Sequence, residues 1–170
     1  MDPTSMTSLC LGKGNRKVGR ILTFSLPSLV TCPGASPWCR EHCYAQRIER
    51  LRPNCSQAYN RNLTVSLNSE RFVASVLRNL PSDTDAVRIH VGGDFYSPEY
   101  CETWERLGRL RPETRFYSYT RSWSLPELLG PLEKLRRLPN ITIFASTDPG
   151  MPLPPQEWRC AFVQTDPRAN

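Results

Sequence analysis

The sequence of 170 residues contains no apolar run that approaches the roughly 20 residues needed by a membrane-spanning helix. Its first residues, Met1 to Met6, also lack the basic stretch followed by an apolar stretch that marks a signal peptide. Both absences favour a cytoplasmic protein that makes no contact with a membrane.

Several common catalytic motifs are missing as well. The chain has no Walker phosphate loop, no Gly-x-Gly-x-x-Gly, no Gly-x-Ser-x-Gly and no His-Glu-x-x-His, and it contains only 2 histidines. These absences exclude the usual phosphate-loop, dinucleotide-binding, serine-hydrolase and zinc-protease sites. Any chemistry must therefore depend on other residues.

Cysteines, by contrast, are plentiful, with 7 in the chain. An odd number in a cytoplasmic protein indicates metal or redox ligands rather than disulfides. Three of them form a compact motif, Cys32-x6-Cys39-x3-Cys43, between a strand-like segment and a helix-like one. Three thiolates can bind one metal centre and leave a coordination position open, which distinguishes a reactive site from a structural one.

The local pattern predicts a helix from Trp38 to about Leu51. Cys39 and Cys43 are four residues apart, so on such a helix they share one face, and Cys32 reaches the same point from the preceding loop. Thiolates are soft ligands that favour iron–sulfur clusters or zinc. We call these three residues the cysteine triplet.

The triplet also has two interpretations without open-site chemistry. A fourth ligand, either His42 or the better placed Cys55, would close the site and make the protein a non-catalytic cluster or zinc module. Alternatively, the three thiols are buried and bind no metal. The remaining cysteines are interpreted as small apolar residues, namely Cys10, Cys101 and Cys160.

The rest of the chain alternates between strand and helix patterns. We predict strands over 21–26, 86–91, 114–119 and 141–145, helices over 97–110 and 125–138, and two earlier helices that begin near Asn54 and Asn68. This alternation predicts an α/β fold with a parallel sheet of about four to five strands and right-handed crossovers. We expect one domain over 1–170, with a cysteine loop at 27–45, βα units over 86–148 and an irregular proline-rich tail over 149–170.

Polar residues follow each predicted strand directly. Ligands of parallel α/β sheets bind at the carboxyl ends of the strands, so these residues are candidates for a binding site. Besides the cysteine loop, they are Gly92, Gly93 and Asp94 after the second strand, Thr120 and Arg121 after the third, and Ser146 and Asp148 after the fourth.

Each candidate is also compatible with a purely structural role. The glycine pair can admit a ligand to the backbone or simply form a tight turn. Arg121 can bind an anion or cap a helix, and the two aspartates can hold a ligand or act as N-caps. Tyr44, directly after the triplet, can cover a metal centre or pack in the core. His90 is interpreted as a core or hydrogen-bonded residue.

The net charge is +6, and most basic residues are arginines. Such a surface can attract nucleic acid. However, the basic residues mostly alternate with acids along the helices, as in Arg47-Ile48-Glu49-Arg50, which is typical of a solvated helix face. Nucleic acid is therefore an alternative partner rather than the favoured one.

Several short segments together resemble a known family. They are Thr23–Pro27, Thr31–Ala35, Cys39, Cys43–Ala45, Gly92–Phe95, Tyr119–Ser122 and Phe144–Asp148. This combination, which covers about residues 11 to 150, is similar to the small phage and actinobacterial proteins grouped as gene-product-88-like.

The pattern in turn resembles a shortened radical S-adenosylmethionine enzyme. The resemblance implies a partial parallel (β/α) barrel with helices on its outer face and a 4Fe–4S cluster held by the cysteine triplet. It implies that Gly92, Gly93 and Asp94 seat the methionine end of S-adenosylmethionine on the fourth iron. The other candidate residues, Tyr44, Thr120, Arg121, Ser146 and Asp148, would then line or support the cofactor pocket.

Two features depart from those enzymes. Their usual spacing is Cys-x3-Cys-x2-Cys, and no further βα units of a full barrel follow Asp148 here. We therefore expect a minimal iron–sulfur protein of this type that needs an electron donor, with a homodimer covering the open barrel. The alternative is the closed, non-catalytic module with Cys55 as fourth ligand.

Overall fold

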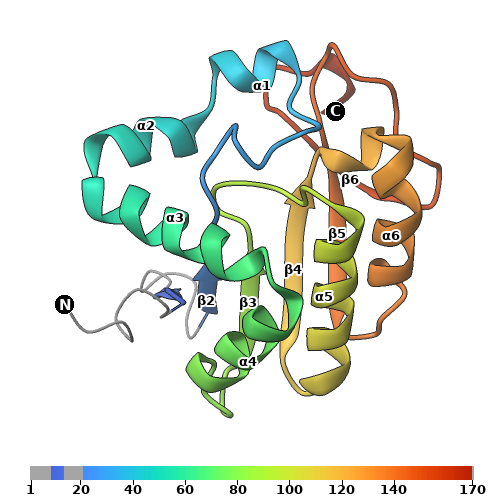
Figure 1. Ribbon diagram of the computed structural model, residues 1–170. Helices are drawn as coiled ribbons and strands as arrows, with labels where there is room; N and C mark the ends of the chain where they lie inside the picture. The colour runs from blue at the N-terminus through green and yellow to red at the C-terminus, as the bar shows by residue number, and fades with distance from the viewer. Residues whose placement is uncertain (1–8, 14–20, 170) are drawn as a thin grey trace.

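The computed structural model describes residues 9–13 and 21–169 of the chain (Figure 1). The expected absence of a signal peptide concerns residues 1–6, which lie outside these ranges. Within the described ranges, none of the helices combines the length and the apolar character needed to cross a bilayer.

A six-stranded sheet forms the centre of the molecule, and its strands follow one another in sequence order. The first strand pairs antiparallel with the second, and every later pair is parallel. The strands are β1 (Gly12–Lys13), β2 (Ile21–Phe24), β3 (Ala86–Ile89), β4 (Arg115–Thr120), β5 (Ile141–Thr147) and β6 (Arg159–Phe162). The predicted α/β class with a mostly parallel sheet is confirmed.

The sequence missed the two edge strands. The two residues of β1 precede the first predicted strand, and β6 falls in the tail predicted as irregular. β6 pairs with β5 over only four positions, from Phe144 opposite Arg159 to Thr147 opposite Phe162. Pairing with a neighbouring strand decides the extended conformation of such short edge strands. Their own sequences therefore carry only a weak alternation of apolar and polar residues.

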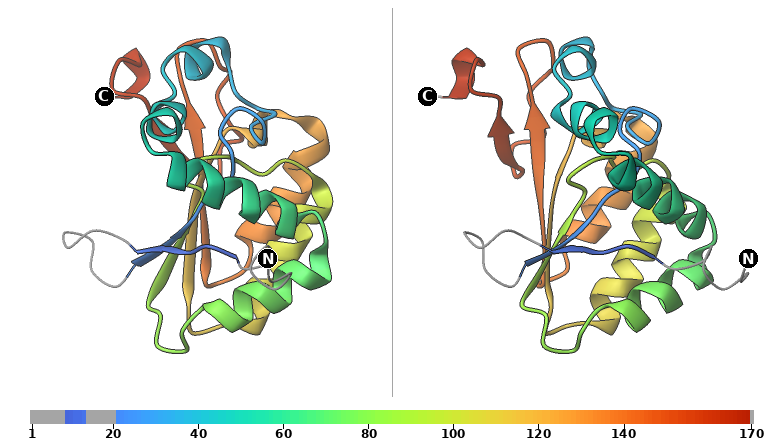
Figure 2. Two further views of the ribbon diagram at one scale, coloured as in Figure 1. Left: turned by 60° about the vertical axis from the view of Figure 1, so that its left-hand side comes forward. Right: turned by 90° about the vertical axis from the view of Figure 1, so that its left-hand side faces the viewer.

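Helices surround one side and one end of the sheet. They are α1 (Pro37–Glu41), α2 (Tyr44–Leu51), α3 (Pro53–Ser66), α4 (Ser69–Asn79), α5 (Pro98–Leu110) and α6 (Pro126–Arg136), with short 3-10 turns η2 (Ser122–Ser124) and η3 (Pro167–Ala169). Figure 2 shows α3 to α6 on the same face of the sheet. Helices α1 and α2 lie beyond the carboxyl ends of the central strands (Figure 1).

Local chemistry explains where these helices begin. Ser97 accepts a hydrogen bond from the Tyr100 amide at 3.2 Å, and Pro98 occupies the first turn of α5. Asn68 caps α4 in the same way through the Arg71 amide at 2.9 Å. Helix α3 begins at Pro53 rather than at the predicted cap Asn54, because a proline fits the first helical position without losing a hydrogen bond.

The helix predicted from Trp38 to Leu51 is wrong as a single element. It breaks into α1 and α2 at His42 and Cys43, and the Cys43 sulfur accepts a hydrogen bond from the Gln46 amide at 3.5 Å as the N-cap of α2. Cys43 therefore has an extended backbone, with φ −68° and ψ 102°. Cys39 and Cys43 lie on separate helices and do not share a helix face.

An aromatic cluster fills the core between β2 and the helices. Phe24, Phe72 and Trp104 meet edge to face, with ring centroids 5.3 to 5.5 Å apart. All three side chains are fully buried, so their apolar area contributes strongly to folding.

Replacement of Phe72 tests this core. Phe72→Ala should lower the free energy of unfolding by about 3–5 kcal/mol, because a large cavity remains between α4 and β2. Leu67→Ala, at a side chain that is 71% exposed, should change it by less than about 0.5 kcal/mol. Urea denaturation followed by circular dichroism measures both, and equal effects would contradict this placement of the core.

Candidate functional site

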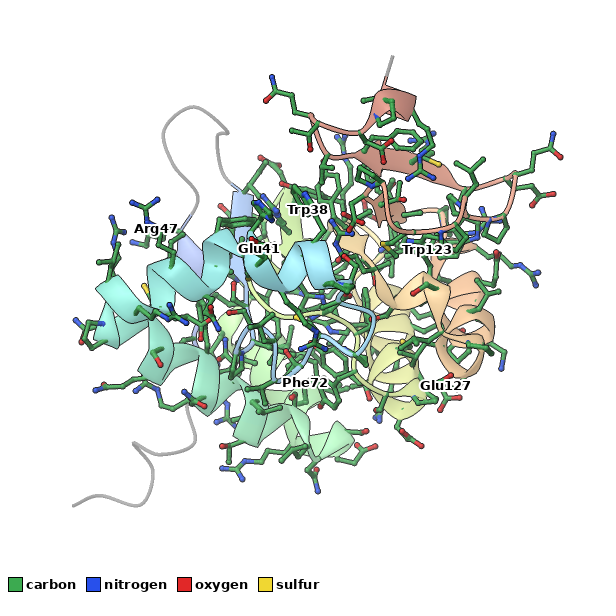
Figure 3. The ribbon with its side chains drawn as sticks, turned by 90° about the horizontal axis from the view of Figure 1, so that it is seen from above. Trp38, Glu41, Arg47, Phe72, Trp123 and Glu127 are labelled. Atoms are coloured by element: carbon green, nitrogen blue, oxygen red, sulfur yellow. The ribbon has the colours of Figure 1, made fainter. Side chains whose placement is uncertain are left out.

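A pocket of about 480 Å³ opens at the carboxyl end of the parallel strands. All three cysteines of the triplet line it, together with the predicted residues Tyr44, Gly92, Gly93, Asp94, Arg121 and Ser146. Seen from above the sheet, α1 with Trp38 lies across this end (Figure 3), and Trp38 also lines the pocket. The structure thus brings together residues from the cysteine loop and from the ends of three strands.

The three thiols influence one another electrostatically. Burial raises the pKa of Cys32 to about 12, with smaller contributions from Asp94, Cys39 and Cys43. Burial also raises the pKa of Cys39, whereas the positive charge of Arg121 opposes that rise. None of the three is in a disulfide. Burial therefore favours the protonated form of Cys32 and of Cys39 in the free protein.

A buried carboxylate ties the cysteine loop to β5. Asp148 accepts hydrogen bonds from the Ser36 hydroxyl at 2.5 Å and from the Arg121 guanidinium. Ser36 is the N-cap of α1 and accepts the Cys39 amide at 3.0 Å. Asp148 is fully buried, so it does not line the pocket itself but fixes two groups at the pocket's edge.

Asp94 plays a similar part between β3 and β4. Its carboxylate accepts the Thr120 hydroxyl at 2.6 Å, the Arg121 amide at 2.8 Å and the Phe95 amide at 2.7 Å. Burial raises the pKa of Asp94, and these hydrogen bonds oppose the rise. Thr120 is fully buried, so its hydroxyl holds the Asp94 carboxylate in place and does not face the pocket.

The glycine pair packs against the start of the cysteine loop. Gly93 has φ +82°, and a β-carbon there would lie 2.6 Å from Leu26 Cβ and from Thr31 Oγ1. The Gly92 carbonyl accepts the Leu26 amide at 2.9 Å, and the Asp94 amide donates to the Thr31 carbonyl at 3.1 Å. The pair therefore holds the cysteine loop against β3, in addition to lining the pocket.

The candidate fourth ligands lie differently. Cys55 belongs to α3 and is not among the residues that line the pocket. His42 lines the pocket, but its ring stacks on Trp38 with centroids 4.5 Å apart. Across residues 9–13 and 21–169, no group of three or more histidine, cysteine or acidic side chains has the arrangement that could hold a metal ion.

Arg88 and Tyr119 are among the pocket residues that were not selected from the sequence. They line the wall formed by β3 and β4, with the Arg88 guanidinium 5.3 Å from the Tyr119 ring centroid. Tyr44 joins them, because its hydroxyl donates to the Val91 carbonyl at 2.7 Å and accepts from Arg88 at 3.3 Å. Their positions in alternating strands could have revealed them, since both follow buried residues and therefore face away from the core.

His90 lies at the strand end as predicted for a buried, hydrogen-bonded residue. Its Nε2 is 3.0 Å from the Tyr100 hydroxyl, and burial lowers its pKa to about 3. Its backbone has φ +66°, which is costly for a residue with a side chain. The imidazole is therefore neutral and belongs to the core.

A close backbone contact at Gly34 provides a test of the loop. A β-carbon at Gly34 would lie 2.4 Å from the Arg121 carbonyl oxygen, so Gly34→Ala must push the loop away. We expect a loss of about 1–3 kcal/mol in the free energy of unfolding and faster labelling of the Cys32 thiol by a thiol reagent. At Gly150 the nearest atom, Asp148 Oδ1, would be 3.5 Å away, so Gly150→Ala should leave the labelling rate unchanged. Equal labelling in both variants would contradict the docking of the loop.

Comparisons with known proteins place these features in a family. The family model described as gene product 88 matches residues 5–166. The Gene 88 protein of Mycobacterium phage L5 is 33% identical over 150 residues, and that of Mycobacterium phage D29 is 28% identical over 149 residues. Each alignment covers 80% of this chain but 61% and 60% of those relatives, so the chain spans about three-fifths of their length. No solved structure matches the chain.

Proposed function

This chain belongs to the gene product 88 family, and we propose that it is a minimal iron–sulfur protein of the radical S-adenosylmethionine type. In this proposal Cys32, Cys39 and Cys43 hold a 4Fe–4S cluster at the carboxyl edge of the sheet. S-adenosylmethionine is the second cofactor, and the protein acts on it as an enzyme. An external electron donor is required.

One observation carries the proposal. The cysteine triplet, which follows β2, and the Gly92–Asp94 segment, which follows β3, line the same pocket. In a parallel sheet this edge is where ligands bind. A set of three thiols beside an accessible backbone and a buried carboxylate suits a cluster with one open iron better than it suits a closed structural site.

The donor set fits a cluster better than a single zinc ion. Zinc bonds each thiolate at about 2.3 Å, so ligand sulfurs lie within roughly 4.6 Å of each other. The described residues contain no group arranged around one ion in that way. Each cysteine of a 4Fe–4S cluster binds a different iron, so three half-buried sulfurs around one pocket can serve it at wider spacing.

The chain's own groups would orient the second cofactor. Asp94 is the carboxylate that lines the pocket, and it would attract the methionine ammonium next to the Gly92–Gly93 backbone. Tyr44 and Ser146 would form walls, while Thr120 and Asp148 would hold Asp94 and Arg121 in place. When bound, the cluster supplies one electron for reductive cleavage of the sulfonium.

A partial (β/α) barrel is the architecture that we infer for this site. The strand order is sequential, with parallel neighbours from β2 to β6, and helices α3 to α6 lie on one face (Figure 2). A (β/α) barrel has the same order, with its helices outside. A sheet that stopped short of closure would leave the inner face and the pocket open on one side.

Anaerobic reconstitution tests the proposal. The protein is incubated with iron and sulfide and then reduced in the presence of S-adenosylmethionine, and 5′-deoxyadenosine is measured by chromatography. We expect a brown protein with about four irons per chain and formation of that product. Cys39→Ala should lose both the colour and the product, whereas Cys55→Ala, outside the pocket, should keep both.

Three results would contradict parts of this proposal. A reconstituted cluster that yields no 5′-deoxyadenosine would rule out the radical enzyme and leave a cluster-binding module. Loss of the cluster in Cys55→Ala would show a closed site with four cysteines. A colourless protein that binds one zinc ion would rule out the cluster.

A further inference from the structure

The sheet has a second face, which lies away from helices α3 to α6 (Figure 2). Alternation and strand register place twelve residues on this second face, which we call the open face. They are Ile21, Thr23, Ala86, Arg88, Arg115, Tyr117, Tyr119, Thr142, Phe144, Ser146, Arg159 and Ala161.

The charge of the open face has one sign. Three of its strand positions carry arginine, and none carries aspartate or glutamate. Some helix arginines have an acidic partner, as in the salt bridges of Arg106 with Glu70 and of Arg109 with Glu105. The strand positions of the open face offer no such partner to their arginines, so this face is positively charged.

Aromatic rings lie between these cations. Tyr119 stacks with Phe144 at 5.0 Å and meets Tyr117 edge to face at 6.3 Å, and the Arg88 guanidinium lies 5.3 Å from the Tyr119 ring centroid. The Tyr119 side chain is 39% exposed, which is unusual for a ring in a central strand. Sheet surfaces that combine exposed rings and arginines bind unpaired bases by stacking and their phosphates by charge.

Arg88 connects the open face with the pocket. It lines the pocket, and its Nε is buried without a hydrogen-bond partner among the described residues. Its Nη2 donates to the Tyr44 hydroxyl at 3.3 Å, a neutral acceptor that leaves the charge uncompensated. A guanidinium that has no acidic partner and lies against a partly exposed ring favours an anionic group on a planar ligand.

We propose that the open face binds single-stranded nucleic acid, with one phosphate at Arg88 and an adjacent base at Tyr119 and Phe144. The nucleic-acid chain would cross the sheet from β3 to β6. One end of the bound segment would lie at Arg88, at the mouth of the pocket, and the other end near Arg159. This proposal goes beyond the cluster chemistry and does not depend on it, because every group that it uses belongs to the protein alone.

A second copy of the chain and duplex nucleic acid fit the open face less well. In a two-fold dimer through this face the same surface meets itself, which brings its arginines toward one another without acidic partners. The homodimer expected from the sequence is therefore not favoured at this surface. Duplex nucleic acid offers phosphates but keeps its bases stacked, so the rings would contribute nothing.

Fluorescence anisotropy of labelled (dT)10 with the cluster-free protein tests the proposal. We expect binding that is tighter than to a ten-base-pair duplex and that weakens with salt. Arg88→Gln should weaken binding about 5- to 20-fold, and Tyr119→Leu should do the same by removing a stacking ring. Arg71→Gln, an exposed position on α4 with the same change in charge, should weaken it less than about twofold. Circular dichroism confirms that each variant is folded, and Tyr119→Leu serves alone if Arg88→Gln does not fold.

Four results would overturn the proposal. Equal losses in Arg88→Gln and Arg71→Gln would show diffuse electrostatic attraction. Equal affinity for the duplex, with no effect of Tyr119→Leu, would exclude base stacking. A dimer in sedimentation that Tyr119→Leu dissociates would make the open face a self-association surface. The absence of binding at low salt would rule out nucleic acid as the ligand of this face.

Discussion

Two buried carboxylates hold the carboxyl edge of this protein together. Asp94 joins the ends of β3 and β4 through Thr120 and the Arg121 amide. Asp148 joins β5 to Arg121 and to Ser36, the N-cap of α1 within the cysteine loop. Arg121 is the residue that both carboxylates share. A buried charge without its partner is costly. These bonds therefore couple the ends of β3, β4 and β5 and the cysteine loop into one arrangement. The pocket depends on this coupling, since the cysteine loop has no strand or long helix of its own to fix it.

The same coupling explains how an irregular loop is held in place at the edge of the pocket. A metal centre needs ligands that stay in place when one coordination position is vacant. Here Ser36 fixes the Cys39 amide, the glycine pair holds the loop at Leu26 and Thr31, and Gly34 packs directly on the Arg121 backbone. The energetic cost of desolvating the thiols is visible in the raised pKa of Cys32. In the proposed holo-protein, a cluster that replaces the thiol protons would offset that cost.

The sequence predicted the parts of this arrangement that have their own local signals. Strand periodicity located β2 to β5, prolines and caps located α5 and α6, and polar residues after the strands identified most of the pocket. It failed where a tertiary contact decides the structure. Strand β6 is an example, because it exists only where β5 offers it an edge. The break between α1 and α2 was missed for a local reason, because Cys43, which is not a usual N-cap residue, caps the second helix. Ser36 was missed because its partner Asp148 is 112 residues away in the chain.

The two faces of the sheet differ in composition and in exposure to solvent. One face buries Phe24, Ile89 and Phe116 under helices and supplies the stability. The other carries arginines and rings at positions that alternate with those core residues. A strand residue cannot serve both faces, so a sequence selected only for folding would carry ordinary polar residues there. The ring of Tyr119 is 39% exposed on this face, where the proposed ligand would contact it. Arg88 belongs both to this face and to the pocket, so a ligand of the kind proposed for the open face would lie beside the pocket that the thiols line.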